Sequence, residues 1–225
     1  MTVAVKGLWN IVLSGYPKSG KTMLANRLIA ENQFFARIGV DELRQMIFNE
    51  FPPCRDEFLI YSMIAEMRDT LLEKGYSVVV DSTAPDNVTR EFLTVTKVRH
   101  VNRLLVVLNV DREVLIKRNI EKSGDASAVF AWDKRWEEPR GGIPIFKFKS
   151  NDMTKFEAYY ARLIELLESE MHPFKPEFHP VIHLKEIRKA LEFLEEKLVV
   201  KNSKGIEPHF LEILYESVPI SVKCP

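Results

Sequence analysis

The stretch Gly15-Tyr16-Pro17-Lys18-Ser19-Gly20-Lys21-Thr22 fits the pattern G-x-x-x-x-G-K-[S/T] and decides the fold. Residues 8–13 before it are a short apolar run rich in β-formers, and residues 23–30 after it are apolar at helical spacing. Strand, loop and helix in this order are typical of a phosphate-binding loop; the alternative is a glycine turn before a helix. Such a loop turns backbone N–H groups and a helix N-terminus toward a polyphosphate. The sequence therefore predicts nucleotide binding by these eight residues.

Within the loop, two side chains carry specific expectations. Lys21 is expected to reach the β- and γ-phosphates of the nucleotide. The hydroxyl of Thr22 is expected to ligate Mg²⁺. The loop therefore predicts a nucleoside triphosphate bound with Mg²⁺.

The composition is that of an ordinary globular protein. Of 225 residues, 46% are hydrophobic and 28% are charged, and 32 basic residues balance 32 acidic ones. This neutral balance excludes the strongly basic character of a general nucleic-acid binder, although a local basic patch stays open. No apolar run approaches the ~18 residues of a membrane span. The two cysteines show no metal-ligand spacing, and we expect a cytoplasmic protein with reduced thiols.

Apolar runs and amphipathic segments alternate along the first half of the chain. Strands are expected over 33–40, 76–80 and 104–108, and helices over 41–48, 56–74, 86–98 and 111–122. This alternation predicts an α/β fold with a right-handed, doubly wound and mostly parallel sheet. The carboxyl ends of its strands, beside the phosphate loop, are where such sheets bind ligands.

The second half of the chain suggests a lid and an appendage. Glycine, proline, cations and aromatics over about 112–150 are typical of a lid that closes over phosphates. A helix is expected over 153–171, a final strand over 180–184 and a helix over 185–199. We therefore expect a kinase-like domain over 1–201 and a C-terminal appendage over 202–225.

Acidic residues follow two of the expected strands. Asp41 is a candidate general base for an attacking hydroxyl, and Arg44 is a candidate ligand of the phosphoryl group or its acceptor. The alternative makes Asp41 a helix N-cap and places Arg44 on a solvated face. Asp81 has the position of an acid that holds Mg²⁺ through water, with Ser82 or Thr83 near the acceptor; the alternative is a capping or turn aspartate.

The helix that enters the expected lid carries two more candidates. Arg118 and Lys122 lie four residues apart and so project from one face, where two cations could clamp the β- and γ-phosphates. The alternative is a pair of solvated surface charges. Arg112 and Arg135 are weaker candidates of the same kind. The aromatic residues Trp132 and Trp136 are candidates for lid packing or for contact with a base.

Three histidines lie close together later in the chain, but their spacing fits no zinc pattern; they are His172, His179 and His183.

Taken together and in order, these motifs resemble P-loop kinases of the polynucleotide 5′-hydroxyl kinase type. The resemblance rests on the phosphate loop, Asp41-x-x-Arg44, the turn Asp81-Ser82-Thr83 and Arg118-Asn119-x-x-Lys122. The segment Arg135-Trp136-Glu137-Glu138-Pro139 is also similar to a lid element of the seryl-tRNA(Sec) kinases and the Elongator-associated P-loop factors. The resemblance covers about residues 8–140.

The resemblance implies ATP·Mg²⁺ bound through Lys21 and Thr22, Asp41 as general base, Arg44 at the acceptor or transferring phosphate, and Arg118 in the lid. Lys122 departs from the family, which usually has arginine there, and so lacks the bidentate fork. The expected activity is transfer of the γ-phosphate to a hydroxyl on RNA, on a tRNA-linked group or on a nucleoside-like molecule. A regulatory ATPase of a tRNA-modification assembly and a small-molecule kinase are the alternatives.

Overall fold

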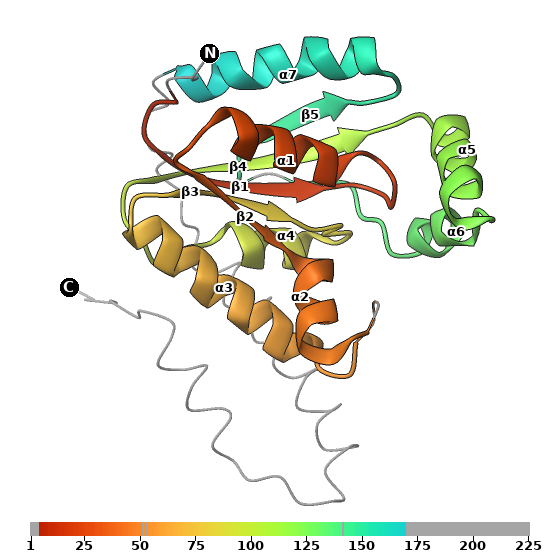
Figure 1. Ribbon diagram of the computed structural model, residues 1–225, viewed down its shortest axis with the longest axis horizontal. Coiled ribbons are helices and arrows are strands. Elements are labelled where there is room, and N and C mark those ends of the chain that lie inside the picture. Colours follow the sequence, from red (N-terminus) through yellow and green to blue (C-terminus); the bar gives the residue numbers. More distant parts are fainter. Residues whose placement is uncertain (1–4, 51, 53, 141, 170–225) are drawn as a thin grey trace, which may run out of the picture. The chain divides into compact units, whose positions relative to one another are not determined.

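The sheet is built around the strand that precedes the phosphate loop. The computed structural model describes residues 5–50, 52, 54–140 and 142–169. In this part of the chain, five parallel strands form one sheet in the order β2-β3-β1-β4-β5 (Figure 1). The strands are β1 (Leu8–Ser14), β2 (Phe35–Gly39), β3 (Ser77–Asp81), β4 (Val101–Asn109) and β5 (Ile145–Lys149). Because β1 is central, the loop that follows it lies at the middle of the sheet's carboxyl edge.

Helices cover both faces of this sheet (Figure 1). They are α1 (Lys21–Glu31), α2 (Val40–Phe48), α3 (Glu57–Glu73), α4 (Asn87–Thr94), α5 (Arg112–Ser123), α6 (Ser127–Asp133) and α7 (Met153–Glu168). One apolar cluster joins side chains of β1 and β4 to α1 and α7, and a second joins the opposite face to α2, α3 and α4. Residues of β1 therefore alternate between two cores, as a strand buried on both faces must. The predicted doubly wound parallel α/β fold is confirmed.

Helix α4 ends four residues earlier than the periodicity predicts, at Thr94 rather than at residue 98. The buried side chain of Asn10 donates to the carbonyls of Leu93 and Thr94, both at 3.0 Å, and Arg68 Nη1 donates to Leu93 at 3.0 Å. These side chains from β1 and α3 satisfy the last carbonyls of the helix, which otherwise lack partners. Tertiary contacts thus decide where α4 ends.

Strand β5 lies within the range 112–150 that the sequence assigned to the lid. From Phe146 onward its residues alternate between aromatic and basic side chains, Phe146-Lys147-Phe148-Lys149, which is a half-buried strand pattern. Phe148 is fully buried and packs edge-on against Phe156 of α7, with ring centroids 5.1 Å apart. Residues 145–149 therefore belong to the sheet, and α5 and α6 form the helical pair beside it.

Several predictions of the sequence fall outside the described residues. These are the strand over 180–184, the helix over 185–199, the boundary at 201/202 and the three histidines. The described residues belong to one unit, residues 1–176. Within them, no helix combines the length and apolarity needed to cross a bilayer.

Candidate active site

The phosphate loop connects β1 to α1 by a turn that only glycine permits at its first position. A Cβ on Gly15 would lie 2.9 Å from Ser19 Oγ and 3.0 Å from the carbonyl oxygen of Leu108. Gly20, at φ 100°, precedes the first residue of α1 and provides no side-chain cap. The first turn of α1 contains no acidic residue. The N–H groups at this helix end are therefore left for an anion.

Lys21 lies in the centre of the loop. Its side chain is buried, and Nζ donates to the carbonyls of Gly15 at 2.9 Å and Tyr16 at 2.8 Å. An ammonium group has three N–H donors, so one remains for another acceptor. Burial lowers the pKa of Lys21 to about 8, and the carboxylates of Asp81 and Asp41 oppose this shift. The structure thus brings two of the predicted acidic residues into the electrostatic environment of the loop.

These features fit a bound polyphosphate. The helix end is uncapped, Lys21 has a spare donor, and the buried hydroxyl of Ser19 has no hydrogen-bond partner within the described ranges. A buried hydroxyl without a partner is costly unless a ligand or water completes its bonding. The predicted nucleotide site therefore has the donors that it needs, and Thr22 is exposed at the start of α1.

Asp81 ends β3 beside the loop and is paired with an arginine that the sequence analysis missed. Asp81 is 7% exposed, and its Oδ2 accepts from Arg37 Nε at 3.1 Å and Nη2 at 2.6 Å. Arg37 lies on β2 and also pairs with Glu42. The register places Gly39 beside Asp81, which brings the two side chains together. Only this strand pairing relates residues that lie 44 positions apart in sequence.

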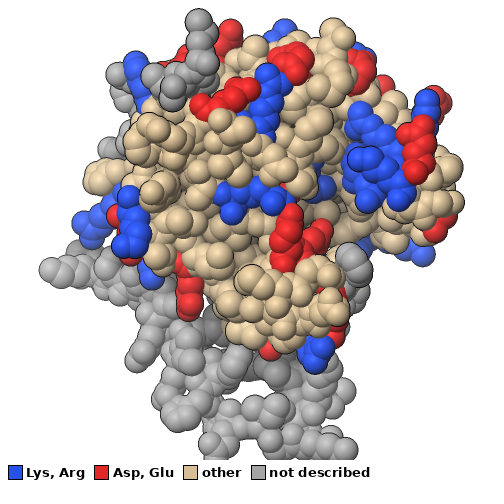
Figure 2. Space-filling view, in the orientation of Figure 1, with Lys and Arg blue, Asp and Glu red and all other residues tan. Residues whose placement is uncertain are grey.

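Asp41 and Arg44 lie in the first two turns of α2, with the carboxylate exposed and the guanidinium buried. Arg44 Nη1 donates to Asp41 Oδ1 at 2.6 Å. The N-cap of α2 is Gly39, and Arg44 is only 6% exposed, so the alternative of an N-cap aspartate and a solvated arginine does not describe this helix. Figure 2 shows acidic and basic side chains next to one another at this end of α2.

Glu57, the first residue of α3, is the main partner of Arg44 and was not predicted. Its carboxylate accepts from Arg44 Nε at 3.0 Å and from Nη2 at 2.6 Å, and from the N–H of Cys54 at 2.8 Å. Burial alone would raise the pKa of Glu57, but the bonds from Arg44 and Cys54 outweigh it and hold the pKa below its ordinary value. A glutamate opening a helix is a common capping signal, so its spacing alone does not indicate this role.

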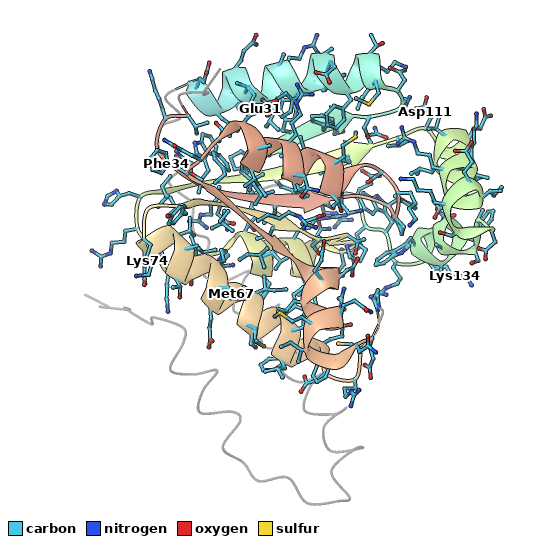
Figure 3. All side chains as sticks on the ribbon, viewed as in Figure 1. Glu31, Phe34, Met67, Lys74, Asp111 and Lys134 are labelled. Carbon is cyan, nitrogen blue, oxygen red and sulfur yellow. The ribbon has the colours of Figure 1, made fainter. Side chains whose placement is uncertain are left out.

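The two predicted lid cations have different environments. Arg118 Nη2 donates to the carbonyls of Ser150 at 2.6 Å and Asn151 at 2.9 Å, after β5, whereas Lys122 is exposed in the last turn of α5. Figure 3 labels Asp111 and Lys134, which flank the helical pair α5–α6 that carries these residues. The pair lies at the carboxyl edge of the sheet, but its predicted phosphate contacts stay predictions.

Other basic and aromatic residues of this region contact one another. Arg112 forms two bonds with Asp133, at 2.9 and 2.6 Å, and the guanidinium of Arg135 lies over the ring of Trp132 at 4.8 Å. Trp136 packs against Tyr16 of the loop, with centroids 5.0 Å apart. Its contact is thus with the phosphate loop, and the packing alternative describes it better than an open base platform.

The fold and the loop define a P-loop nucleotide-binding protein of kinase-like architecture. The chain belongs to the AAA_33 family, described as an AAA domain, which matches residues 11–140, more than half of the sequence. No curated protein matches the chain.

Solved structures share this fold at low identity. A gluconokinase from Sinorhizobium meliloti 1021 has a TM-score of 0.52 and 21% identity, over 73% of this chain and 98% of that chain. The Mycobacterium tuberculosis APS kinase CysC, in complex with AMPPNP and APS, has a TM-score of 0.55 and 18% identity, over 72% and 99%. Kti12 of Chaetomium thermophilum, in complex with ADP-AlF3, has a TM-score of 0.51 and 16% identity, over 71% and 99%. At these identities the likeness shows the fold alone.

Proposed function

We propose that this protein is an ATP-dependent kinase that transfers the γ-phosphate to a hydroxyl group on RNA, on a tRNA-linked group or on a nucleoside-like molecule. The observation that carries the proposal is the position of Asp41. Its carboxylate is 59% exposed in the first turn of α2, directly after β2, and its charge raises the pKa of Lys21 in the phosphate loop. A proton acceptor open to solvent beside a phosphate cradle is what a hydroxyl acceptor needs.

The roles of the site residues follow from their contacts. Lys21 would bind the phosphates and stabilise charge on the transferring group, while the Thr22 hydroxyl would ligate the metal and the Asp81 carboxylate would hold it through water. When bound there, Mg²⁺ would supply positive charge that neutralises the phosphates. Arg44, held by Glu57, orients the Asp41 carboxylate toward the acceptor side. Arg118 and Lys122 supply positive charge from α5.

A second candidate is a regulatory protein whose nucleotide hydrolysis serves an assembly rather than an acceptor. The observation that favours it is that protein partners already occupy part of each cation. Arg44 donates to Asp41 and Glu57, and Nη2 of Arg118 donates to two backbone carbonyls, which leaves fewer donors for a transferring phosphate. The fold is shared both by kinases of small molecules and by Kti12, and it does not choose between these functions.

The deciding experiment follows the label of γ-labelled ATP. The full chain is incubated with Mg²⁺ and a panel of 5′-hydroxyl RNA, total tRNA, seryl-tRNA, nucleosides and sugars, and the products are separated. Label on one acceptor supports the kinase and identifies its substrate class. Label released only as inorganic phosphate, and faster with tRNA, supports the regulatory protein. Absence of both label transfer and release contradicts the two proposals.

A further inference from the structure

Arg90 of α4 is a buried cation whose guanidinium is saturated by neutral oxygens. It is 1% exposed, and within the described residues it has no carboxylate at ion-pair distance. Burial lowers its pKa from the ordinary value. Its Nε donates to Ser14 Oγ at 3.1 Å and to the Ala84 carbonyl at 2.9 Å. Its Nη1 donates to the Glu137 carbonyl at 2.7 Å and to Asn87 Oδ1 at 3.1 Å. Its Nη2 donates to the Pro85 carbonyl at 2.9 Å. Every nitrogen of the fork is therefore used.

Two of these partners lie directly beside the phosphate loop. Ser14 is the last residue of β1, and its hydroxyl also donates to Ala84 at 2.8 Å. The N–H of Gly15 donates to the carbonyl of Thr83 at 3.1 Å. Ala84 has a φ of 35°, which is unfavourable for a residue with a Cβ and persists only where the surroundings impose it. Arg90 thus holds the turn after Asp81 against the start of the loop.

The third partner belongs to the segment that leaves α6, residues 134–140, here called the strap. Glu137 accepts from Arg90 through its carbonyl, and its N–H donates to Pro85 at 2.9 Å. Its carboxylate accepts from the N–H of Asn87 at 3.0 Å. These bonds fix the strap on the N-terminal end of α4. The strap is therefore attached to the same arginine as the turn and the loop.

An aromatic stack completes the connection. The ring of Trp136, in the strap, contacts both the guanidinium of Arg90, 4.6 Å from its centroid, and the ring of Tyr16, whose centroid is 5.0 Å away. Tyr16 is the second residue of the phosphate loop, and its hydroxyl donates to Asp133 of α6 at 3.1 Å. Any movement of Tyr16 when phosphates enter the loop must displace Trp136 or alter its packing.

We propose that Arg90 is a positioning residue, which through Ser14, the turn 83–85 and Trp136 couples nucleotide occupancy of the phosphate loop to the position of the strap. The inference rests on the proposed nucleotide-binding function and adds a route from the loop to α6. A buried arginine serving only to fill the core would need no bonds to three segments that meet at the loop. The planar fork of arginine provides these bonds, whereas lysine would keep the charge and lose them.

The test uses the fluorescence of Trp136 in the full chain. Trp132 is first replaced by Phe, which leaves Trp136 and the fully buried Trp9 of β1 as emitters. MgADP is titrated while emission and, separately, calorimetric heat are recorded. We expect an emission change that follows the calorimetric binding curve, and its loss when Trp136→Phe is added. The Trp136→Phe change also provides a variant that leaves Arg90 in place.

Arg90→Lys is expected to abolish the emission change and to weaken MgADP binding about 10-fold, the value of one or two charge-assisted bonds. Arg27→Lys is the matched control, because Arg27 is a partly buried arginine that also lies over an aromatic ring, Tyr160 at 4.0 Å, and contacts α7 instead of the strap. It should leave both signals unchanged. Thermal unfolding of each variant verifies that it is folded.

Two outcomes overturn the inference in distinguishable ways. If MgADP binds by calorimetry but the emission of Trp136 does not respond, or if folded Arg90→Lys keeps the emission change or the wild-type affinity, the coupling is wrong while the nucleotide site stands. If the wild-type chain gives no calorimetric binding of MgADP, the proposed function fails and the inference fails with it.

Discussion

At the scale of single residues, the site is a set of charges whose values depend on their neighbours. Lys21 is buried within its own loop, with a pKa of about 8, while Asp41, four residues after Arg37, stays exposed. Burial disfavours the charged form of Lys21 and lowers its pKa, and the nearby carboxylates partly offset this shift. We therefore expect the contribution of Lys21 to nucleotide affinity to depend on pH, and the contribution of Asp41 to be revealed by substitution.

The nucleotide affinity should fall at alkaline pH. Bound phosphates favour the charged form of Lys21 and raise its pKa, so above pH 8 binding takes up a proton. The affinity for MgADP should have its full value below pH 8, where Lys21 is protonated, and should decrease above pH 8 by up to about tenfold per pH unit. Calorimetry at pH 7 and pH 9, in buffers of different ionisation enthalpy, measures both the affinity and the proton uptake. Lys18→Met removes an exposed lysine of the same loop whose charge lowers the pKa of Lys21, so this variant should keep the fall in affinity but shift it to higher pH. Equal wild-type affinities at pH 7 and pH 9 would contradict the prediction.

Replacement of Asp41 by Asn should remove transfer without removing nucleotide binding. The amide accepts a hydrogen bond from Arg44 but cannot take a proton, so the rate of transfer to an identified acceptor should fall about 10²- to 10⁴-fold. The affinity for ATP should stay within a few-fold. Glu42→Gln, a neighbouring exposed carboxylate on α2, is the control and should change the rate little. Undiminished transfer by the Asp41 variant would remove this residue from the role of base.

At the scale of elements, ion pairs connect α2 to α3 and β2 to β3. Arg44 joins the first turns of α2 to Glu57 at the start of α3, and Arg37 joins β2 to Asp81 at the end of β3. Each arginine has two carboxylate partners from two elements. Asp41 and Asp81 thus belong to ion-pair networks that include Glu57 and Arg37, which lie outside the recognisable motifs.

Glu57→Gln should lower the free energy of unfolding by about 1–2 kcal/mol, because it leaves the buried Arg44 with one carboxylate partner. The expected loss is smaller than for a fully buried ion pair because Glu57 is partly exposed to solvent. Urea denaturation measures the change. Glu50→Gln removes a carboxylate from the exposed Arg55 and should have no measurable effect. Equal midpoints for the two variants would show that the Arg44–Glu57 pair does not stabilise the fold.

At the scale of the whole described unit, the position of β5 limits what can move. Strand β5 pairs with β4 from Ile145 to Lys149, and Phe148 joins the apolar cluster of α1 and α7. A lid can therefore include α5, α6 and the strap, but not β5. The strap itself is held on α4 by Glu137.

Phe148→Ala should destabilise the protein by about 3–5 kcal/mol, the usual cost of removing a fully buried ring. Phe130→Ala, on α6 with a ring that is 51% exposed, should change stability by less than about 0.5 kcal/mol. Urea denaturation of the two variants compares the contributions of these β5 and α6 side chains to the free energy of unfolding. A small effect of Phe148→Ala would contradict the inclusion of β5 in the core.

The local patterns of the sequence determined the phosphate loop, the parallel α/β order and most element boundaries. These features depend on residues close in sequence: glycine spacing, apolar periodicity and helix-stop signals. The alternation of Phe146 and Phe148 with lysines is a strand pattern, but the sequence analysis placed these residues in the lid because of the glycines and proline just before them. Position after a strand identified Asp41 and Asp81, because parallel strands place their carboxyl ends at one edge.

Only the tertiary structure decided which charges meet. Arg37 reaches Asp81 through strand register, Glu57 reaches Arg44 through packing of α3 on α2, and Arg90 reaches Ser14 and the strap through burial of α4. No spacing rule relates such pairs, since their separation in sequence is arbitrary while their energies depend on distance and on exclusion of water. The phosphate loop could be identified from eight consecutive residues, whereas the charged contacts around it could be identified only from the tertiary structure.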